Sequence, residues 1–197
     1  MVSAAQSVSN LGLSGIVSAT PTIGQRFSAS KVVTVRNYPT LKEFASLRCD
    51  WSHKSPTVVF VGTIDPSRGV LELIEGFARM PAVSGARLVI AGSRRGDEYD
   101  VALDNAARGH SVTFPGFISR SEMAELLGEA SVGAVTSLPC DTANEAISTK
   151  LFEYMAAGIP VVTSAMPLWS HIVDSAQCGS AVNPHEPTEV AQALHHW

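Results

Sequence analysis

From residue 57 onward, short apolar runs alternate with segments of about ten residues whose apolar positions recur at helical spacing. The runs TVVFV at 57–61 and RLVIA at 87–91 are almost continuously apolar, which is typical of strands covered on both faces. Strands that alternate with helices of this length are joined by crossover connections and lie parallel. The sequence therefore predicts a doubly wound α/β domain with a parallel sheet, which binds ligands beyond the carboxyl ends of its strands.

The same periodicity locates the individual elements of this domain. The expected strands are 57–61, 87–92, 112–114, 132–135 and 160–164. The expected helices are 70–80, one through 102–107, 121–129, 149–157 and 187–195. Ser121, with Glu125 four residues later, is interpreted as an imperfect start signal for the third helix.

The first 50 residues follow a different pattern. Two strand-like runs, 14–19 and 32–35, bracket a short segment, and a short helix is expected at 41–48. These elements are too few to bury a core of their own. We expect residues 1–50 to be the last piece of a preceding domain together with a linker, and residues 51–197 to form the main domain.

Composition narrows the possible partners. The chain has 197 residues, of which 45% are hydrophobic and 16% charged, and a net charge of -4, so it lacks the basic surface of a nucleic-acid-binding protein. Its three cysteines have no CxxC spacing and its six histidines no zinc spacing, so no disulfide, metal or cofactor is expected. No apolar run reaches the roughly 18 residues of a membrane span. No charged signal region precedes Arg26, and we expect a cytoplasmic protein.

The segment 145–164, EAISTKLFEYMAAGIPVVTS, carries the strongest indication of a site. Glu145 and Glu153 have seven residues between them and flank the polar turn 148–150, which opens a predicted helix. The first amides of a helix have no internal acceptor and bind anions readily. Carboxylates accept hydrogen bonds from hydroxyl groups. Together these features indicate a nucleotide-sugar site.

Each of these residues also has a plainer interpretation. Glu153 suits a first-turn acid favoured by the helix dipole, and Glu145 a solvated loop acid. Ser148 or Thr149 suits a helix N-cap, and Lys150 a solvated surface lysine. Spacing alone does not separate the two interpretations, but the location after a predicted strand, on the ligand-binding edge, favours the site.

A second indication lies in the loop 62–69, GTIDPSRG, which follows the first predicted strand. Gly62 and Gly69 permit the backbone turn, and Arg68 stands where the next helix begins. A guanidinium group binds a diphosphate through two parallel hydrogen bonds, and the alternative is a solvent-facing arginine. The motifs GxxxxGK[ST], GxGxxG and GxSxG are absent, which argues against a P-loop, the usual dinucleotide fingerprint and a hydrolase nucleophile elbow.

On these motifs the chain resembles the carboxyl-terminal half of retaining GT-B glycosyltransferases, in the glycogen-synthase-like group called glycosyltransferase family four. The likeness covers Val58 to about Ala193 and includes VFVG…SRG…LIEGF, RLVIAG and VTFPGFIS. It is most specific in EAISTKLFEYMAAGIPVVTS. Residues 14–39 resemble the end of that family's amino-terminal domain and its interdomain linker.

The resemblance implies roles for individual residues. Glu145, which would face the transferred sugar, Arg68, which would bind the donor diphosphate, and Lys150 are the expected catalytic residues. Glu153 would hold the ribose hydroxyls, the amides of 148–151 would cradle phosphate, and the nucleobase would pack at 116–118. The expected donor-binding residues are Gly62, Phe117, Ile118, Ser148, Thr149, Leu151 and Glu153.

This sequence departs from the family pattern at one position of the loop. The family often has an arginine directly after the glycine that ends the first strand, and this chain has Thr63 there. Two consequences are open: the phosphate is held less tightly, or Lys150 compensates.

The resemblance also implies a function. We expect a hexosyl-type transferase that moves a sugar from a nucleotide diphosphate sugar to a glycan or lipid-linked acceptor with retention of configuration. This reaction would need no metal or cofactor and would serve the synthesis of cell-surface polysaccharides or glycoconjugates. Two alternatives remain open, a non-catalytic nucleotide-sugar-binding or partner module and a nucleotide-sugar epimerase of the GT-B fold.

In that family the acceptor binds to the amino-terminal domain, of which this chain holds the last pieces. The family's final helix, which crosses back, is also absent, so we expect a domain truncated at its carboxyl end. Such a fragment would bind the donor without completing the transfer alone. The full-length protein is expected in the cytoplasm, with a location at the membrane periphery left open.

Overall fold

The computed structural model describes residues 9, 11–44, 55–140 and 147–197. A six-stranded sheet has the order β5-β4-β3-β6-β7-β8, and every neighbouring pair in it is parallel. Its strands are β3 (Thr57–Val61), β4 (Arg87–Ala91), β5 (Val112–Gly116), β6 (Val132–Val135), β7 (Val161–Ser164) and β8 (Gly179–Val182). The predicted doubly wound parallel sheet is confirmed.

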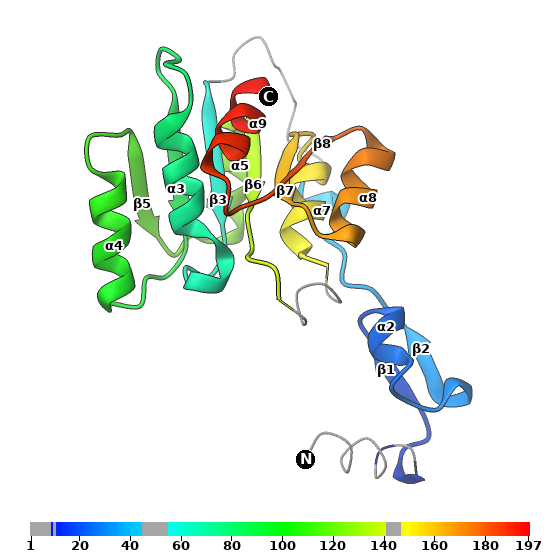
Figure 1. The fold of residues 1–197 in the computed structure, drawn as a ribbon. Coiled ribbons are helices and arrows are strands. Elements are labelled where there is room, and N and C mark those ends of the chain that lie inside the picture. Colours follow the sequence, from blue (N-terminus) through cyan, green and yellow to red (C-terminus); the bar gives the residue numbers. More distant parts are fainter. Residues whose placement is uncertain (1–8, 10, 45–54, 141–146) are drawn as a thin grey trace.

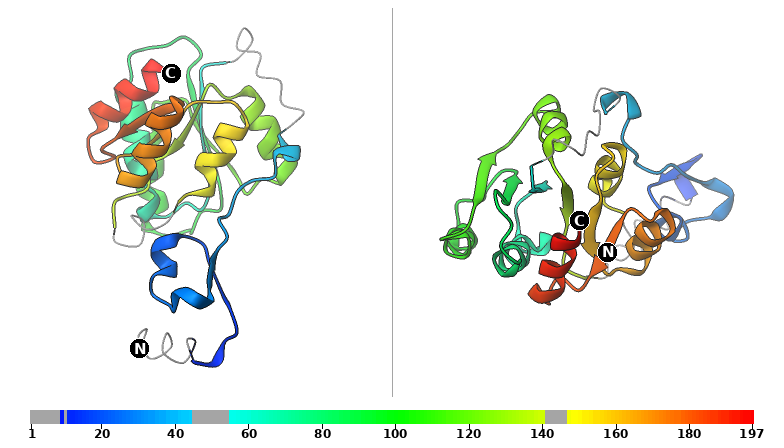
Figure 2. Two further views of the ribbon diagram at one scale, coloured as in Figure 1. Left: turned by 90° about the vertical axis from the view of Figure 1, so that its right-hand side faces the viewer. Right: turned by 90° about the horizontal axis from the view of Figure 1, so that it is seen from above.

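Helices follow the strands on both faces of this sheet (Figure 1). They are α3 (Val70–Arg79), α4 (Glu98–Ala107), α5 (Arg120–Glu129), α7 (Thr149–Ala156), α8 (Pro167–Ala176) and α9 (Pro187–His196). A short 3-10 turn, η4 (Pro66–Arg68), precedes α3. Figure 2 shows the sheet between its two helical layers.

Alternation along each strand divides the apolar side chains between two cores. In β3, Val59 and Val61 belong to the core that is covered by α5, α7 and α8. Val58 and Phe60 belong to the opposite core, under α3, α4 and α9. Because successive side chains of a strand point to opposite faces, a continuously apolar run fills both cores at once.

The predicted elements agree with the observed ones to within a few residues, with two exceptions. Helix α5 is capped by Ser119 and not by Ser121, and Ser119 forms a full capping box with Glu122. The box spacing was therefore present two residues earlier than the sequence interpretation placed it. The short helix expected at 41–48 is observed as a 3-10 turn, η2 (Leu41–Glu43), and residues 45–48 lie outside the described part of the chain.

A separate two-stranded parallel sheet lies near the start of the chain, away from the larger sheet (Figure 1). It pairs β1 (Ile16–Ser18) with β2 (Val32–Thr34), and the helix α2 (Pro21–Gly24) and the 3-10 turn η1 (Ala29–Lys31) connect them. A sheet of this size needs further strands or helices to be stable on its own. No helix in the described residues has both the length and the apolar character of a membrane span.

The chain order of the six strands reverses between β3 and β6, and these two strands separate toward their carboxyl ends. They pair at Val58 and Val59, and beyond that the Val61 amide donates a hydrogen bond of 3.0 Å to the hydroxyl of Tyr154. The Tyr154 ring lies against Gly133, where an added Cβ would come within 2.3 Å of it. Burial raises the pKa of this phenol well above its ordinary value. Tyr154 thus fills the point where the sheet opens.

We predict that replacing Tyr154 by phenylalanine destabilises the domain. The substitution leaves the buried Val61 amide without its acceptor, which costs about 1–3 kcal/mol. Tyr38→Phe is the matched control, because the Tyr38 hydroxyl accepts an exposed hydrogen bond from Arg36, and it should change the free energy of unfolding by less than about 0.5 kcal/mol. Urea denaturation measures both variants. Equal effects would show that the Tyr154 hydroxyl does not stabilise the opening.

Candidate active site

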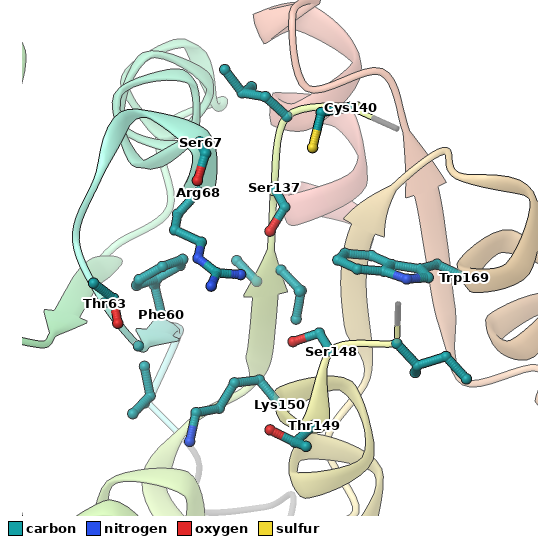
Figure 3. A pocket seen from close by; sticks show the side chains of 16 residues that line it. Phe60, Thr63, Ser67, Arg68, Ser137, Cys140, Ser148, Thr149, Lys150 and Trp169 are labelled. Carbon is teal, nitrogen blue, oxygen red and sulfur yellow. The ribbon is translucent and has the colours of Figure 1, made fainter. Parts of the chain in front are cut away.

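A cavity of about 570 Å³ lies at the carboxyl ends of β3 and β6. Arg68 projects from η4 into it, between Phe60 and Ser148 (Figure 3). Several hydroxyl groups line the same cavity, those of Thr63, Ser67, Ser137, Ser148 and Thr149. A guanidinium group among hydroxyl donors suits a polyanionic, oxygen-rich ligand.

The loop that carries Arg68 is held by hydrogen bonds to the residues after β6. The Leu138 amide donates to the Ser67 carbonyl at 2.8 Å, and the Thr136 hydroxyl donates to the Gly69 carbonyl at 3.0 Å. Gly69 has a positive φ of 63°, and a Cβ there would meet the Thr136 carbonyl oxygen at 1.9 Å. Only glycine therefore permits this approach, which sets the direction of the Arg68 side chain.

A second cavity, of about 420 Å³, adjoins the first along the same edge. The two cavities share four lining residues, Val61, Gly62, Thr63 and Lys150. The second extends over the ends of β4 and β5, where Gly92, Ser93, Phe117, Ile118 and Arg120 line it. Phe117 is 82% exposed, so its ring is free to stack on a planar group. One elongated ligand can occupy both cavities.

Lys150 and Arg120 hold the carboxylate of Glu153 between them. The Lys150 Nζ lies 2.6 Å from Oε2 of Glu153, and the Arg120 Nη1 lies 2.6 Å from Oε1. The Glu153 side chain is only 6% exposed. Arg120 also pairs with Glu43 of η2. Its hydrogen bond to Glu153, and to a smaller extent that to Glu43, raises the pKa of the Arg120 guanidinium.

The amino-terminal turn of α7 presents polar groups to the first cavity. Ser148 is the N-cap residue, but its side chain makes no capping hydrogen bond. Its hydroxyl, with Thr149 and Lys150, lines the cavity. The Leu151 side chain is fully buried in the core, and its amide donates to the Ser148 carbonyl at 3.3 Å.

The structure brings most of the predicted site residues to this edge. Gly62, Arg68, Ser148, Thr149 and Lys150 line the first cavity, and Phe117 and Ile118 line the second. Glu153 lies beneath Lys150 and lines neither cavity. The first-turn interpretation of Glu153 is wrong, because α7 begins at Thr149 and has no acid in its first turn. Glu145 lies outside the described residues.

Sequence reasoning missed Arg120, Ser137 and Trp169. Arg120 is the first residue of α5, directly after the cap Ser119, and this helix follows a predicted strand, so its position at the carboxyl edge of the sheet was recognisable. Ser137, which follows β6, and Trp169 of α8 both line the first cavity, although they are far apart in the sequence. No group of three or more histidine, cysteine or acidic side chains placed to bind a metal occurs among the described residues.

A family model described as "Glycosyl transferases group 1" matches residues 55–197, which is most of the chain. The chain belongs to this family. A curated relative from Methanocaldococcus jannaschii, named as an uncharacterized glycosyltransferase, is 30% identical over 136 residues. The match covers 68% of this chain and 33% of that relative, so this chain spans about a third of the relative's length.

Solved structures of GT-B glycosyltransferases share the fold. Anabaena HepE, solved in complex with UDP and glucose, superposes with a TM-score of 0.76 at 19% identity, over 98% of this chain and 56% of that protein. Sucrose-phosphate synthase from Thermosynechococcus elongatus gives a TM-score of 0.69 at 22% identity, over 91% of this chain and 48% of that protein. This chain therefore spans about half the length of these two proteins. The resemblance to GT-B enzymes is confirmed at the level of family and fold.

We predict that Glu153→Gln destabilises the domain more than Glu43→Gln does. Glu153 is buried between two cations, and loss of a charge-assisted pair costs about 1–3 kcal/mol. Glu43 and Arg120 are 41% and 54% exposed, so their pair contributes less than about 1 kcal/mol. Urea denaturation at low and high salt compares the two variants. An equal loss of free energy of unfolding in both variants would show that the buried Glu153 contributes no more stability than the exposed Glu43.

Proposed function

We propose that the chain binds a nucleotide diphosphate sugar across the two adjoining cavities and forms the donor side of a retaining glycosyltransferase. The observation that carries the proposal is the arrangement of cations along one edge. Arg68 stands in the first cavity, and Lys150 stands where the two cavities join. A diphosphate between a nucleoside and a sugar has its negative charge in the middle of an elongated molecule, which matches this arrangement.

The residues that line each cavity indicate which part of this ligand would bind there. The nucleobase would lie in the second cavity against Phe117 and Ile118, whose exposed aromatic and apolar surface suits stacking. The sugar would lie in the first cavity toward Ser137 and Trp169, since hydroxyl groups there can bond sugar hydroxyls. The complex of Anabaena HepE with UDP and glucose supports this choice of ligand class.

The proposed chemistry is electrostatic stabilisation of the leaving diphosphate. As the bond between sugar and phosphate breaks, negative charge grows on the diphosphate, and prearranged donors near it lower the barrier. Arg68, Lys150 and the first amides of α7 would supply these donors, while the leaving phosphate accepts the proton of the acceptor hydroxyl. Glu145 would face the transferred sugar. The sugar donor is already activated, so we propose no cofactor and no metal.

The remaining parts of the proposal concern the whole protein. Residues 1–50 would be the end of an acceptor-binding domain and its linker, and residues 51–197 the donor domain. The reaction would take place in the cytoplasm and transfer a hexose to a glycan or lipid-linked acceptor. One solved relative, WaaG, is described as involved in lipopolysaccharide biosynthesis, which supports a role in cell-surface polysaccharides.

Donor binding is tested by calorimetry with UDP, GDP and ADP. We predict that Arg68→Met weakens binding of the preferred diphosphate by about tenfold or more, because a charge-assisted hydrogen bond contributes about 1.5–3 kcal/mol. Arg79→Met is the matched control, since Arg79 is exposed and ends α3 at the opposite edge of the sheet. The proposal is wrong if no diphosphate binds, or if Arg68→Met and Arg79→Met bind it equally well.

Stereochemistry and reaction type are tested together by proton NMR of the anomeric signals. In slow transfer to water, we predict that the released sugar first carries the anomeric configuration of the donor. Release with the opposite configuration would contradict retention. A nucleotide sugar that changes its own sugar without releasing it would instead support the epimerase.

A further inference from the structure

We propose that Lys150 and Glu153 form a latch that the donor diphosphate opens, so that the ribose is recognised only after phosphate is bound. This inference rests on the proposed function and concerns the order of recognition within the same site. It assigns Lys150 two successive partners, Glu153 in the free protein and the diphosphate in the complex. The latch makes the protein discriminate against nucleosides that lack phosphate.

The first observation is that Glu153 is covered. Lys150 occupies Oε2 and Arg120 occupies Oε1, each at 2.6 Å. The Met123 sulfur lies 3.7 Å from the Lys150 amine and 3.9 Å from Arg120 Nη1, and it fills the space between them. The carboxylate lines neither cavity. In the free protein, a ribose therefore meets the two cations and not the carboxylate.

The second observation is that Lys150 and Arg120 differ in how readily each can move away from Glu153. Arg120 is held on its other face by Glu43, so it is fixed between two carboxylates. Lys150 has one carboxylate partner among the described residues, Glu153, and lines both cavities. A lysine amine at the end of four flexible carbons changes partner more readily than a planar guanidinium held at two points. Lys150 is therefore the cation that can move away from Glu153, while Arg120 stays in place.

The third step concerns which ligand groups can displace it. Ribose hydroxyls are neutral donors, so they lack the full positive charge with which the Lys150 amine attracts the Glu153 carboxylate. A diphosphate carries its own negative charge and attracts the Lys150 amine away from Glu153. Oε2 is then free to accept a hydrogen bond from a ribose hydroxyl, while Arg120 keeps Oε1 paired and the carboxylate ionised.

The latch predicts that phosphate and nucleoside fragments bind cooperatively to the wild-type chain. Pyrophosphate draws Lys150 off Glu153, so saturating pyrophosphate should tighten binding of the matching nucleoside by about fivefold, which corresponds to about 1 kcal/mol. By linkage, the nucleoside should tighten pyrophosphate binding by the same factor. Ligand-observed NMR titrations measure each fragment alone and in the presence of the other.

The variant Lys150→Met gives effects of opposite sign on the two ligands. It removes the cation that would bind phosphate, so the diphosphate should bind about tenfold more weakly. It also frees Oε2, so the nucleoside alone should bind more tightly, and the cooperativity should vanish. A merely structural role for Lys150 would weaken both ligands together. Lys150→Arg should retain part of the cooperativity, and Lys42→Met, at an exposed linker lysine, is the control that should change nothing.

The outcomes separate the latch from the proposed function. Diphosphate binding with independent or competing fragments overturns the latch and leaves the donor site intact. The same holds if Lys150→Met weakens nucleoside and diphosphate alike. Absence of binding by every nucleoside diphosphate contradicts the proposed function, and the latch with it. Because the cooperativity is measured on the wild-type chain, the test does not depend on the folding of any variant.

Discussion

The hydrogen bond from the Val61 amide to the Tyr154 hydroxyl lies at the position on which the site depends. The strand order reverses between β3 and β6, which pair at Val58 and Val59. The buried Val61 amide beyond this pairing needs another acceptor. Tyr154 supplies it from α7, the helix whose first turn lines the first cavity. One side chain therefore joins the carboxyl end of β3 to the helix whose first turn lines the first cavity.

The charged residues of the site follow from this placement. Glu153 directly precedes Tyr154, so anchoring Tyr154 in the core also places Glu153 at the edge of the core, where it is almost fully buried. A buried carboxylate requires partners, and Lys150 and Arg120 provide them from α7 and α5. The resulting cluster gives the second cavity a positively charged wall next to a hidden acid. That arrangement underlies both the proposed donor site and the proposed latch.

Much of the fold could be predicted because the signals were local. The apolar runs of β3 and β4 and the helical spacing of α3 need no knowledge of the rest of the chain. Polar contacts were harder to predict. The cap of α5 was misplaced by two residues, although Ser119 and Glu122 have the spacing of a capping box in the sequence. Arg120 was missed because its partners, Glu43 and Glu153, are far from it in sequence.

The sequence by itself determined the parallel α/β architecture, the edge at which the two cavities lie and most of the residues that line them. It did so because strand periodicity and the carboxyl-end rule depend on nearest neighbours and on the order of elements. Tertiary structure alone decided that Glu153 is covered by cations, that Leu151 belongs to the core, and that Lys150 stands between two cavities. The Lys150–Glu153 pair has the i,i+3 spacing of neighbours on one helix, but the Arg120 contact and the two cavities depend on residues from separate elements meeting in space.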